Sequence, residues 1–554
     1  MYSFNQLKES DAFYHLKTGQ FIWEAKTIPH SDIFSYTALG SPWVTHEWLA
    51  EVIFYLVQNL TGFWGLLGFT AFIAFLVYFF IFRLALKKGA EFNLTLILLF
   101  GLGYFTFKFF IPRPQIFAYL AFVILIYLLE SYRQKPKSKY LWLILFDIWF
   151  WVNINASFIL GLVVIAFYAI AEWLKSKTIP KNLLIATGAA TLISFINPNT
   201  YKIFLYSLYV KPAAETLKIL EWKSIIYSWR ETEPLIFLIE MALAGAFLIW
   251  WFYFRKQSQD MVWLGLVMGI SILPFISLRH YVFWPMAAIA PLAVAVSGVL
   301  KEKLKDFPWQ RLYPVTPVTK DGALEEKSLI GHPSLSQRVK YLGCNGVYVP
   351  VLTLGLIFLI ARYLSFPRSY INDYQLPVAA ADFIGANYLR GPLFNLYNEG
   401  GYLIWRFWPK EKIFIDGRSE VFGPTQLDEF FTVVGSLPGW EKLVDEKYKI
   451  NYFILAYWPQ SLSKSIQPLI LNLVSKNWQL VFLDDAALVF ARPDKENQPL
   501  IEKYALKHIN PFRDPKKIPR EEAEAAAQEM RRLLERSPRS LIVEDYARKF
   551  LSSH

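Results

Sequence analysis

Cysteine is almost absent from this chain of 554 residues. The single one, Cys344, excludes an intramolecular disulfide, and the sequence contains no Cys-x-x-Cys pair or Cys/His zinc pattern. It also contains no Walker loop, no Gly-x-Ser-x-Gly elbow and no His-Glu-x-x-His motif. Disulfide scaffolds, zinc modules and the enzyme classes that depend on these three motifs are therefore excluded.

Charged residues are also scarce, at 18%, whereas hydrophobic residues make up 55% and aromatic residues 18% of the chain. The mean hydropathy of +0.29 and apolar runs of bilayer length predict a polytopic membrane protein. The formal charge of +12 comes from Lys and Arg clusters at the ends of apolar runs, where membrane insertion places them. We therefore expect no nucleic-acid partner. The first residues, MYSFNQLKES, lack the features of a signal peptide, so insertion is expected to rely on the later spans.

The apolar runs predict about ten transmembrane helices. Their expected limits are 62–86, 92–110, 115–131, 140–152, 157–174, 182–196, 234–254, 261–277, 280–299 and 346–364. If the spans alternate in direction, the loops rich in Lys and Arg fall on one side, at 87–91, 132–139, 175–181, 255–260 and 301–345. The positive-inside rule assigns these loops to the cytoplasm, so the residues before the first span lie outside.

The predicted fold class is a polytopic α-helical membrane protein with a C-terminal extracytoplasmic α/β domain and a helical tail. The expected parts are an outer polar segment with an amphipathic helix at 1–61, a transmembrane domain at 62–364, the α/β domain at 365–495 and the tail at 496–554. In the α/β domain we expect strands at 393–397, 413–416, 452–456 and 480–490, and helices at 378–389, 425–434 and 462–474. In the tail, a strong polar helix is expected after Pro519.

The segment from Ser10 to Glu51 gathers ionisable side chains just before the first span. Asp11 and His15 are four residues apart, which places both on one face of a helix. If that face meets a cavity at the membrane surface, an aspartate there can act as a general base, and a neighbouring His or acid can bind a metal ion or a phosphate. The alternative is a solvated polar loop.

Three more residues of this segment each admit two interpretations. His46 and Glu47 precede the amphipathic run WLAEVIFYLVQNL, and they are either helix-entry residues or contacts to a site. Asp32, in IPHSDIFSYT, is either a turn former or a second carboxylate.

Cationic side chains at the expected outer ends of spans are candidates for binding the phosphate of a lipid carrier. Arg113, Arg279 and His280 occupy such positions, and Lys108 lies just inside one. The alternative for each of them is snorkelling to lipid headgroups.

Polar breaks next to the apolar runs have two interpretations as well. Asn153 and Asn155, and the segment NPNTY at 197–201, either line a cavity or end a helix. Glu221 and Trp222 either reach a site or are ordinary interfacial residues.

The expected outer domain contains NEGGYLIWRFWP followed by KIFIDGRSE. Gly400 and Gly401 permit a tight turn or a close approach of two backbones. Asp416 and Arg418 present a carboxylate and a guanidinium together at the end of an expected strand. This pair is either structural or a weak acceptor-binding site.

Several stretches resemble the integral-membrane glycosyltransferases of the GT-C fold, and in particular a group of prokaryotic multispan proteins classed with them. These stretches are DAFYHLKTGQFI, IPHSDIFSYTALGSPWVTHEWLAE, WVNINASFILG, INPNTY and GGYLIWRFWPKEKIFIDGR, and the resemblance covers residues 10–490. Where this group tends to show Asn-x-His after a Trp, the present chain has Asn153-Ile154-Asn155, which argues against a metal or proton role there.

The resemblance implies transfer of a sugar from a polyprenyl-phosphate carrier to a protein, lipid or glycan acceptor at the outer face of the plasma membrane. By this analogy Asp11 is the catalytic base, and Arg279 lies near the carrier phosphate. The expected substrate-binding residues are His15, Asp32, His46, Glu47, Arg113, Arg279 and His280. The expected partners are the lipid-linked donor, the acceptor and membrane lipids, and a divalent metal ion is the one cofactor left open.

We therefore hypothesise an inverting glycosyltransferase in which Asp11 takes the acceptor proton. A lipid-linked donor fits an outward-facing site, because soluble nucleotide sugars stay in the cytoplasm. One alternative is a transporter or flippase of lipid-linked intermediates, which would need ionisable residues near the bilayer midplane and internal repeats. The other is a non-catalytic assembly or scaffold protein that uses the outer domain and the tail.

Overall fold

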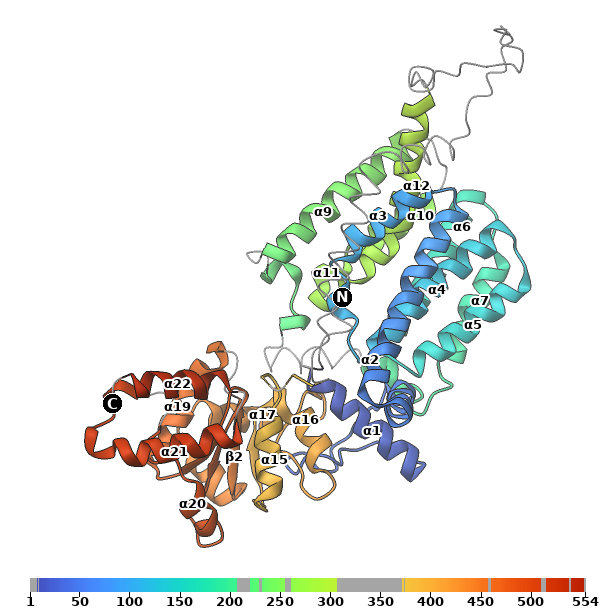
Figure 1. Ribbon diagram of the computed structural model, residues 1–554. Coiled ribbons are helices and arrows are strands. Elements are labelled where there is room, and N and C mark those ends of the chain that lie inside the picture. The colour runs from blue at the N-terminus through green and yellow to red at the C-terminus, as the bar shows by residue number, and fades with distance from the viewer. Residues whose placement is uncertain are drawn as a thin grey trace, which may run out of the picture.

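The computed structural model describes residues 7, 9–206, 220–228, 232–254, 261–305, 371–372, 374–456, 460–509, 515–537 and 540–552. These residues form a helical bundle and a C-terminal α/β domain that lies at one end of the bundle (Figure 1). Helix α1 (Asp11–Ala25) lies between the two parts. It packs against the first helix of the bundle and against a helix of the C-terminal domain.

The bundle contains five helical segments that are long and apolar enough to cross a membrane, within the described residues. They are α2 (Trp48–Lys87), α4 (Gln115–Gln134), α6 (Phe158–Ser176), α9 (Thr232–Ile249) with its π-helical extension, and α12 (Phe283–Lys305) with the short turn before it. Shorter helices complete the bundle: α3 (Phe92–Gly103), α5 (Ser138–Val152), α7 (Lys181–Ile193), α10 (Met261–Ile270) and α11 (Leu273–Ile276). Each expected span up to residue 299 coincides with one or two of these helices, whereas the span at 346–364 and most of the loop at 301–345 lie outside the described residues.

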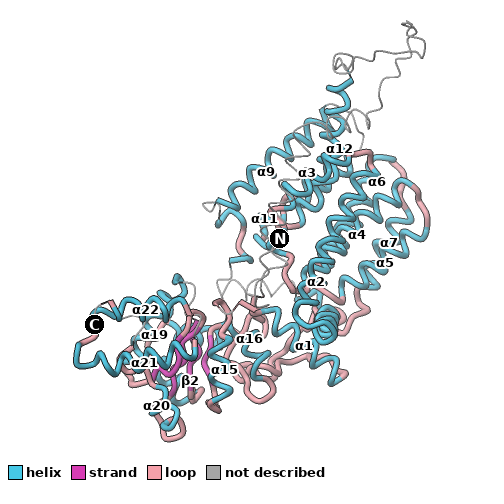
Figure 2. Tube along the Cα trace, viewed as in Figure 1, coloured by secondary structure: helices cyan, strands magenta, loops and turns pink. Residues whose placement is uncertain are grey.

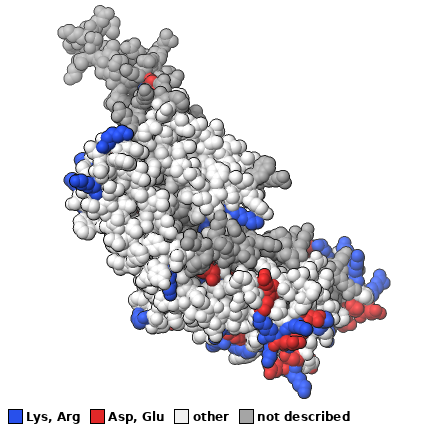
Figure 3. All heavy atoms as spheres, turned by 180° about the vertical axis from the view of Figure 1, so that it is seen from behind, with Lys and Arg blue, Asp and Glu red and all other residues white. Residues whose placement is uncertain are grey.

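The outer surface of the bundle is suited to lipid. Large apolar side chains such as Phe75, Trp142, Ile185 and Leu243 are exposed on several helices. In Figure 3 this surface is almost free of charged residues, whereas the C-terminal domain carries many. Exposed apolar surface of this extent is unfavourable in water and favourable in a bilayer, as expected of a membrane domain.

The amphipathic run after Trp48 and the first span form two helices that meet at a kink, and together they make up the 40 residues of α2. Gly62 interrupts the helical backbone with φ 71° and ψ −172°, a conformation open to glycine alone. The kink at Gly62 therefore coincides with the predicted boundary between the amphipathic helix and the first span.

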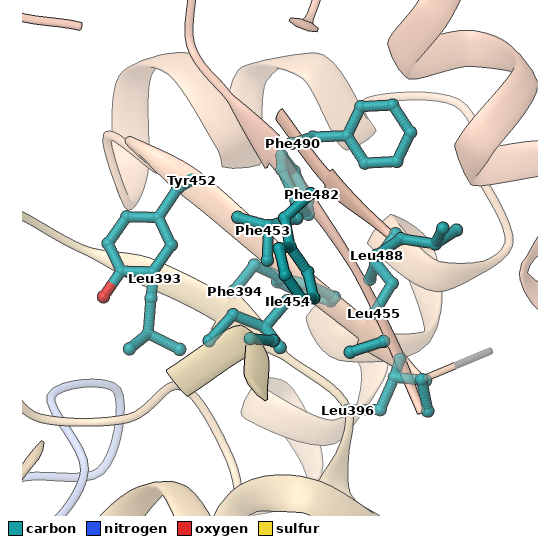
Figure 4. Close-up of a cluster of buried hydrophobic side chains, with 14 of the residues drawn as sticks. Leu393, Phe394, Leu396, Tyr452, Phe453, Ile454, Leu455, Phe482, Leu488 and Phe490 are labelled. Carbon is teal, nitrogen blue, oxygen red and sulfur yellow. The ribbon is translucent and has the colours of Figure 1, made fainter. Parts of the chain in front are cut away.

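The C-terminal domain is built on one four-stranded sheet, drawn in magenta in Figure 2. The strand order is β1 (Leu393–Asn395), β2 (Tyr452–Ala456), β4 (Ala487–Ala491) and β3 (Gln479–Leu483), in which β1 and β2 are parallel and the other neighbours antiparallel. The helices of this domain are α15 (Val378–Ala386), α16 (Tyr397–Phe407), α17 (Pro424–Val434), α18 (Trp440–Lys442), α19 (Gln460–Ser475) and α20 (Gln498–Tyr504). Almost every strand residue is buried, because helices and loops cover both faces of the sheet (Figure 4).

Two of the predicted strands differ from the structure. The segment 413–416 is not a strand of the sheet but forms an isolated parallel bridge to the N-terminal segment, in which the Ile413 N–H donates to Phe34 O and the Tyr36 N–H donates to Ile413 O. The stretch 480–490 is a hairpin of two strands, since the Asp484 carboxylate accepts the Ala487 N–H and closes a turn. The polar helix expected after Pro519 is α21 (Ala523–Arg536), and a second tail helix, α22 (Leu541–Leu551), follows it.

The C-terminal domain contacts the start of α1 through glycines. A Cβ atom on Gly401 would lie 2.4 Å from Ser10 O, so only glycine allows this approach. The Tyr402 N–H donates to Ser10 Oγ at 2.8 Å, and the rings of Tyr402 and Phe13 meet edge to face at 5.0 Å. The glycine pair thus serves a close backbone approach inside a helix, one of the two expected uses.

A buried ion cluster holds the same two parts together. The Arg418 guanidinium donates to Asp32 Oδ1 at 2.7 Å and to Asp416 Oδ2 at 2.6 Å, and all three side chains are nearly inaccessible. Asp32 also accepts from the backbone N–H and the hydroxyl of Ser35, which matches its interpretation as a turn former. The cluster therefore joins a turn of the N-terminal segment to the Asp-Gly-Arg loop of the C-terminal domain.

Replacing Arg418 with glutamine leaves two buried carboxylates without a cation. We expect the free energy of unfolding to fall by about 3–5 kcal/mol, visible as a lower thermal melting midpoint in detergent. The control is Arg390→Gln, because Arg390 is 45% exposed where it pairs with Glu411, and exposed pairs contribute about 0–1 kcal/mol. Equal melting midpoints for the two variants would contradict a stabilising role of the cluster.

Replacing Gly401 with alanine should loosen the contact with α1. The added methyl group must displace Ser10 O, and overpacking of this kind costs about 1–3 kcal/mol. Gly385→Ala is the matched control, because that helical glycine is exposed and has nothing within 4 Å of its Cβ position. Thermal melting of both variants distinguishes a close contact from a general effect of adding a methyl group.

Candidate functional site

A cavity of about 1130 Å³ opens where the bundle, the N-terminal segment and the C-terminal domain meet. The N-terminal segment contributes Glu9, Ser10, Asp11, Tyr14, His46 and Glu47. The bundle contributes polar residues from several helix ends, among them Arg113, Asn155, Glu221, Trp222, Arg279 and His280. The C-terminal domain contributes Tyr397, Asn398, Glu399, Gly417, Arg418, Ser419 and Glu420. The cavity is therefore large enough for a small organic substrate, and each of the three parts contributes polar groups to its wall.

Asp11 is the first residue of α1, and its side chain is 27% exposed at the cavity wall. Its Oδ2 lies 2.8 Å from Arg113 Nη2, at the loop before α4. A Cβ atom on Gly417 would lie 2.6 Å from Asp11 Oδ1. Gly417 therefore lets the carboxylate fit beneath the Asp-Gly-Arg loop, and the C-terminal domain forms part of the environment of Asp11.

Arg113 is surrounded by carboxylates. Besides Asp11, Glu9 Oε2 lies 2.9 Å from Nη2 and Glu221 Oε2 lies 3.8 Å from Nη1. One guanidinium thus faces three acidic groups, which leaves this part of the cavity with excess negative charge.

The proton affinity of Asp11 is shifted by its surroundings. Burial raises the pKa of Asp11 to about 6, the positive charge of Arg113 opposes that rise, and the charges of Glu9 and Glu221 add to it. Asp11 is therefore ionised at neutral pH and has the proton affinity of an effective general base.

His15 lies one turn below Asp11 on α1, but it does not line the cavity. It is 2% exposed, and its Nδ1 is 2.9 Å from Glu51 Oε1, while Nε2 is 3.8 Å from Glu47 Oε2. Burial keeps the pKa of His15 well below its usual value, so the ring is neutral. The predicted shared helix carries both residues, but only Asp11 reaches the cavity.

His46 and Glu47 both line the cavity. Glu47 occupies the N-cap position of α2, yet its side chain makes no capping bond and accepts from Asn155 Nδ2 at 2.7 Å. Burial raises the pKa of Glu47 to about 7. The His46 ring packs on Tyr206 at 4.2 Å between centroids. Asn153, in contrast, accepts from the Trp48 indole at 3.0 Å and holds the start of α2 in place.

The cations predicted for phosphate binding differ in their surroundings. Arg279 and His280 belong to one short turn at the cavity wall, and the Arg279 guanidinium lies 4.6 Å from the ring of Trp222. Within the described residues Arg279 forms no ion pair, whereas Arg113 is held by three carboxylates. Lys108 pairs with Glu233 at 2.9 Å and does not line the cavity.

Of the predicted acceptor-binding pair, Arg418 lines the cavity and Asp416 does not. Both belong to the buried ion cluster with Asp32, which gives them a structural role. Acceptor binding by this pair stays a prediction.

The sequence analysis missed Glu9, Glu399 and Glu420 at the cavity wall. The signal for Glu399 was its position directly before the glycine pair, which marks a turn pressed against another part of the chain.

The described residues of the cavity do not form an evident binding site for a divalent metal ion. No group of three or more His, Cys, Asp and Glu side chains is close enough to hold one in the described part of the chain. The carboxylates nearest to Asp11 converge on the Arg113 guanidinium instead. The described residues at this wall therefore do not fit a metal ion, and the mechanism below uses none.

Comparison with known proteins yields structural matches alone: no protein-family model and no curated protein matches the chain. The chain is similar to the archaeal oligosaccharyltransferase AglB from Archaeoglobus fulgidus in complex with an inhibitory peptide and a dolichol-phosphate, with a TM-score of 0.52, 11% identity, and coverage of 86% of this chain and 69% of that chain. The apo form of the Archaeoglobus fulgidus oligosaccharyltransferase gives a TM-score of 0.49 at 13% identity, over 92% of this chain and 73% of that chain. The first similarity confirms the GT-C fold that the sequence resemblance implies.

Proposed function

We propose that this protein is a membrane glycosyltransferase that transfers a sugar from a polyprenyl-phosphate-linked donor to an acceptor at the outer face of the plasma membrane. The observation that carries the proposal is the position of Asp11, an accessible carboxylate at the wall of a large cavity shared by the bundle and the C-terminal domain. The similar archaeal protein was solved with a dolichol-phosphate, and a lipid-linked phosphate is the carrier proposed for this chain.

The distribution of basic residues supports an outward-facing cavity and an extracytoplasmic C-terminal domain. Helices α2, α4 and α6 all begin next to cavity residues and end in basic residues: Lys87 in α2, Arg133 in α4 and Lys175 in α6. Cytoplasmic helix ends are the ones that carry Lys and Arg. The cavity is at the other end of these helices, on the side proposed to face out.

Asp11 would act as the base in a single displacement. As the acceptor oxygen or nitrogen attacks the anomeric carbon, its proton passes to Asp11 and the bond between that carbon and the carrier phosphate breaks. The electron pair leaves with the phosphate, and the new bond forms on the opposite face of the sugar. The reaction therefore inverts the configuration of the sugar.

Arg279 is the side chain best placed to hold the leaving phosphate. It lines the cavity, forms no ion pair among the described residues, and stacks on Trp222, which orients its guanidinium. Charge-assisted hydrogen bonds to phosphate strengthen as negative charge builds up on the leaving group. The proposed roles of His46, Glu47 and His280 are contacts to the donor, because they line the same wall.

Asp11→Asn removes the base and keeps the shape of the side chain. We expect the transfer rate from a radiolabelled polyprenyl-phosphate sugar to fall about 10²–10⁴-fold, with an unchanged melting midpoint. Asp382→Asn is the control, because that carboxylate is 64% exposed on α15. Full activity of the Asp11→Asn variant would contradict the proposed mechanism.

The pH dependence tests the protonation state of Asp11. Because the base must be ionised and its pKa is about 6, kcat should fall as the pH drops through about 6. Arg113 lowers this pKa, so Arg113→Gln should move the acid limb of the profile to higher pH. In a profile of kcat from pH 4.5 to 8.5, a limb that stays in place or moves to lower pH would contradict the assignment. Arg390→Gln, a change in an exposed pair, provides the control.

A further inference from the structure

The first turn of α16 faces the cavity with three consecutive residues, Tyr397, Asn398 and Glu399. Its position is fixed by the two glycines that follow. A Cβ atom on Gly400 would lie 2.2 Å from Ile415 O, and one on Gly401 would lie 2.4 Å from Ser10 O. The turn is therefore clamped between the Asp-Gly-Arg loop and the residue that precedes Asp11.

Glu399 is the unusual member of this turn. Its side chain lines the cavity and is 4% exposed, and Oε2 has no hydrogen-bond partner among the described residues. Backbone N–H groups of Leu396 and of Glu399 itself favour the carboxylate, as in a helix capping box. A buried carboxyl oxygen that lacks a partner costs free energy, and a ligand that reached Glu399 from the cavity would supply the missing bond.

We propose that this turn is the acceptor subsite and that Glu399 binds a hydroxyl group of an uncharged saccharide, holding it beside Asp11. The inference rests on the proposed function and adds the acceptor class to it. The Tyr397 ring, the Asn398 amide and the Glu399 carboxyl offer an apolar face, a donor and an acceptor within one turn, a combination that fits a hydroxyl-bearing ring.

The charges around the turn select against other acceptors. Glu9, Asp11 and Glu420 also line the cavity, whereas Arg113 and Arg418 are already paired with carboxylates, so an acidic acceptor at this turn would be repelled. Burial raises the pKa of Glu399 to about 8, which leaves the group mostly neutral at pH 7. A neutral carboxyl both donates and accepts hydrogen bonds, as a hydroxyl partner requires, whereas an ammonium acceptor would need an ionised partner.

The subsite can be tested by binding, independently of catalysis. Purified full-length protein in detergent is titrated with neutral tetrasaccharides (maltotetraose, cellotetraose and chitotetraose), with tetragalacturonic acid as the acidic probe. We expect saturable binding of at least one neutral tetrasaccharide, and an affinity at least about tenfold lower for tetragalacturonic acid.

Glu399→Ala should weaken binding of the neutral tetrasaccharide about tenfold, because one hydrogen bond is lost. Glu399→Gln retains a donor, an acceptor and the helix cap, so its affinity should stay within about threefold of the wild type. Glu441→Gln, at a half-exposed carboxylate on α18, is the control and should bind like the wild type. Unchanged binding by the Glu399→Ala variant, preference for the acidic probe, or no binding of any neutral tetrasaccharide would each overturn the subsite.

The failure of this inference differs from the failure of the proposed function. If transfer depends on Asp11 but tetrasaccharide binding does not depend on Glu399, the enzyme proposal stands and the subsite is wrong. If Glu399 governs tetrasaccharide binding but no polyprenyl-phosphate sugar is ever a donor, the subsite stands and the transferase proposal is wrong.

Discussion

The ion pair between Asp11 and Arg113 is the contact on which the account depends. It joins the first residue of α1 to the loop before α4, and it lies directly under Gly417 of the C-terminal domain. Three parts of the chain that are far apart in sequence therefore define the environment of one carboxylate. Because Arg113 opposes the effect of burial, the carboxylate stays ionised at neutral pH and still accepts a proton readily.

Much of the fold follows from periodicity and apolar length. Runs such as 115–131 and 157–174 are continuous apolar stretches, and each is a helix of the bundle. The predictions were wrong where tertiary contacts determine the secondary structure of a segment. The segment 413–416 has the composition of a strand, but its backbone pairs with Phe34 and Tyr36 of the N-terminal segment. No local pattern encodes that pairing, because the partners are almost 400 residues apart.

Less of the candidate site than of the fold could be predicted from the sequence. Asp11 could be singled out, because it lies among ionisable side chains just before the first span and in a stretch that resembles the GT-C glycosyltransferases. Its spacing to His15 suggested a joint role, yet packing turns His15 away from the cavity and onto Glu51. Glu399 was missed because its burial and its lack of a hydrogen-bond partner at Oε2 depend on how the C-terminal domain docks, which no spacing rule expresses.

The central claim is that a lipid-linked donor enters this cavity and presents its sugar to Asp11. A cryo-EM structure of the full chain with a non-hydrolysable polyprenyl-phosphonate sugar measures this directly. The account predicts phosphonate density beside Arg279 and Trp222, with the anomeric carbon facing Asp11. Density for the phosphonate at the basic end of the bundle, near Lys87 and Arg133, or a sugar turned away from Asp11, would contradict it.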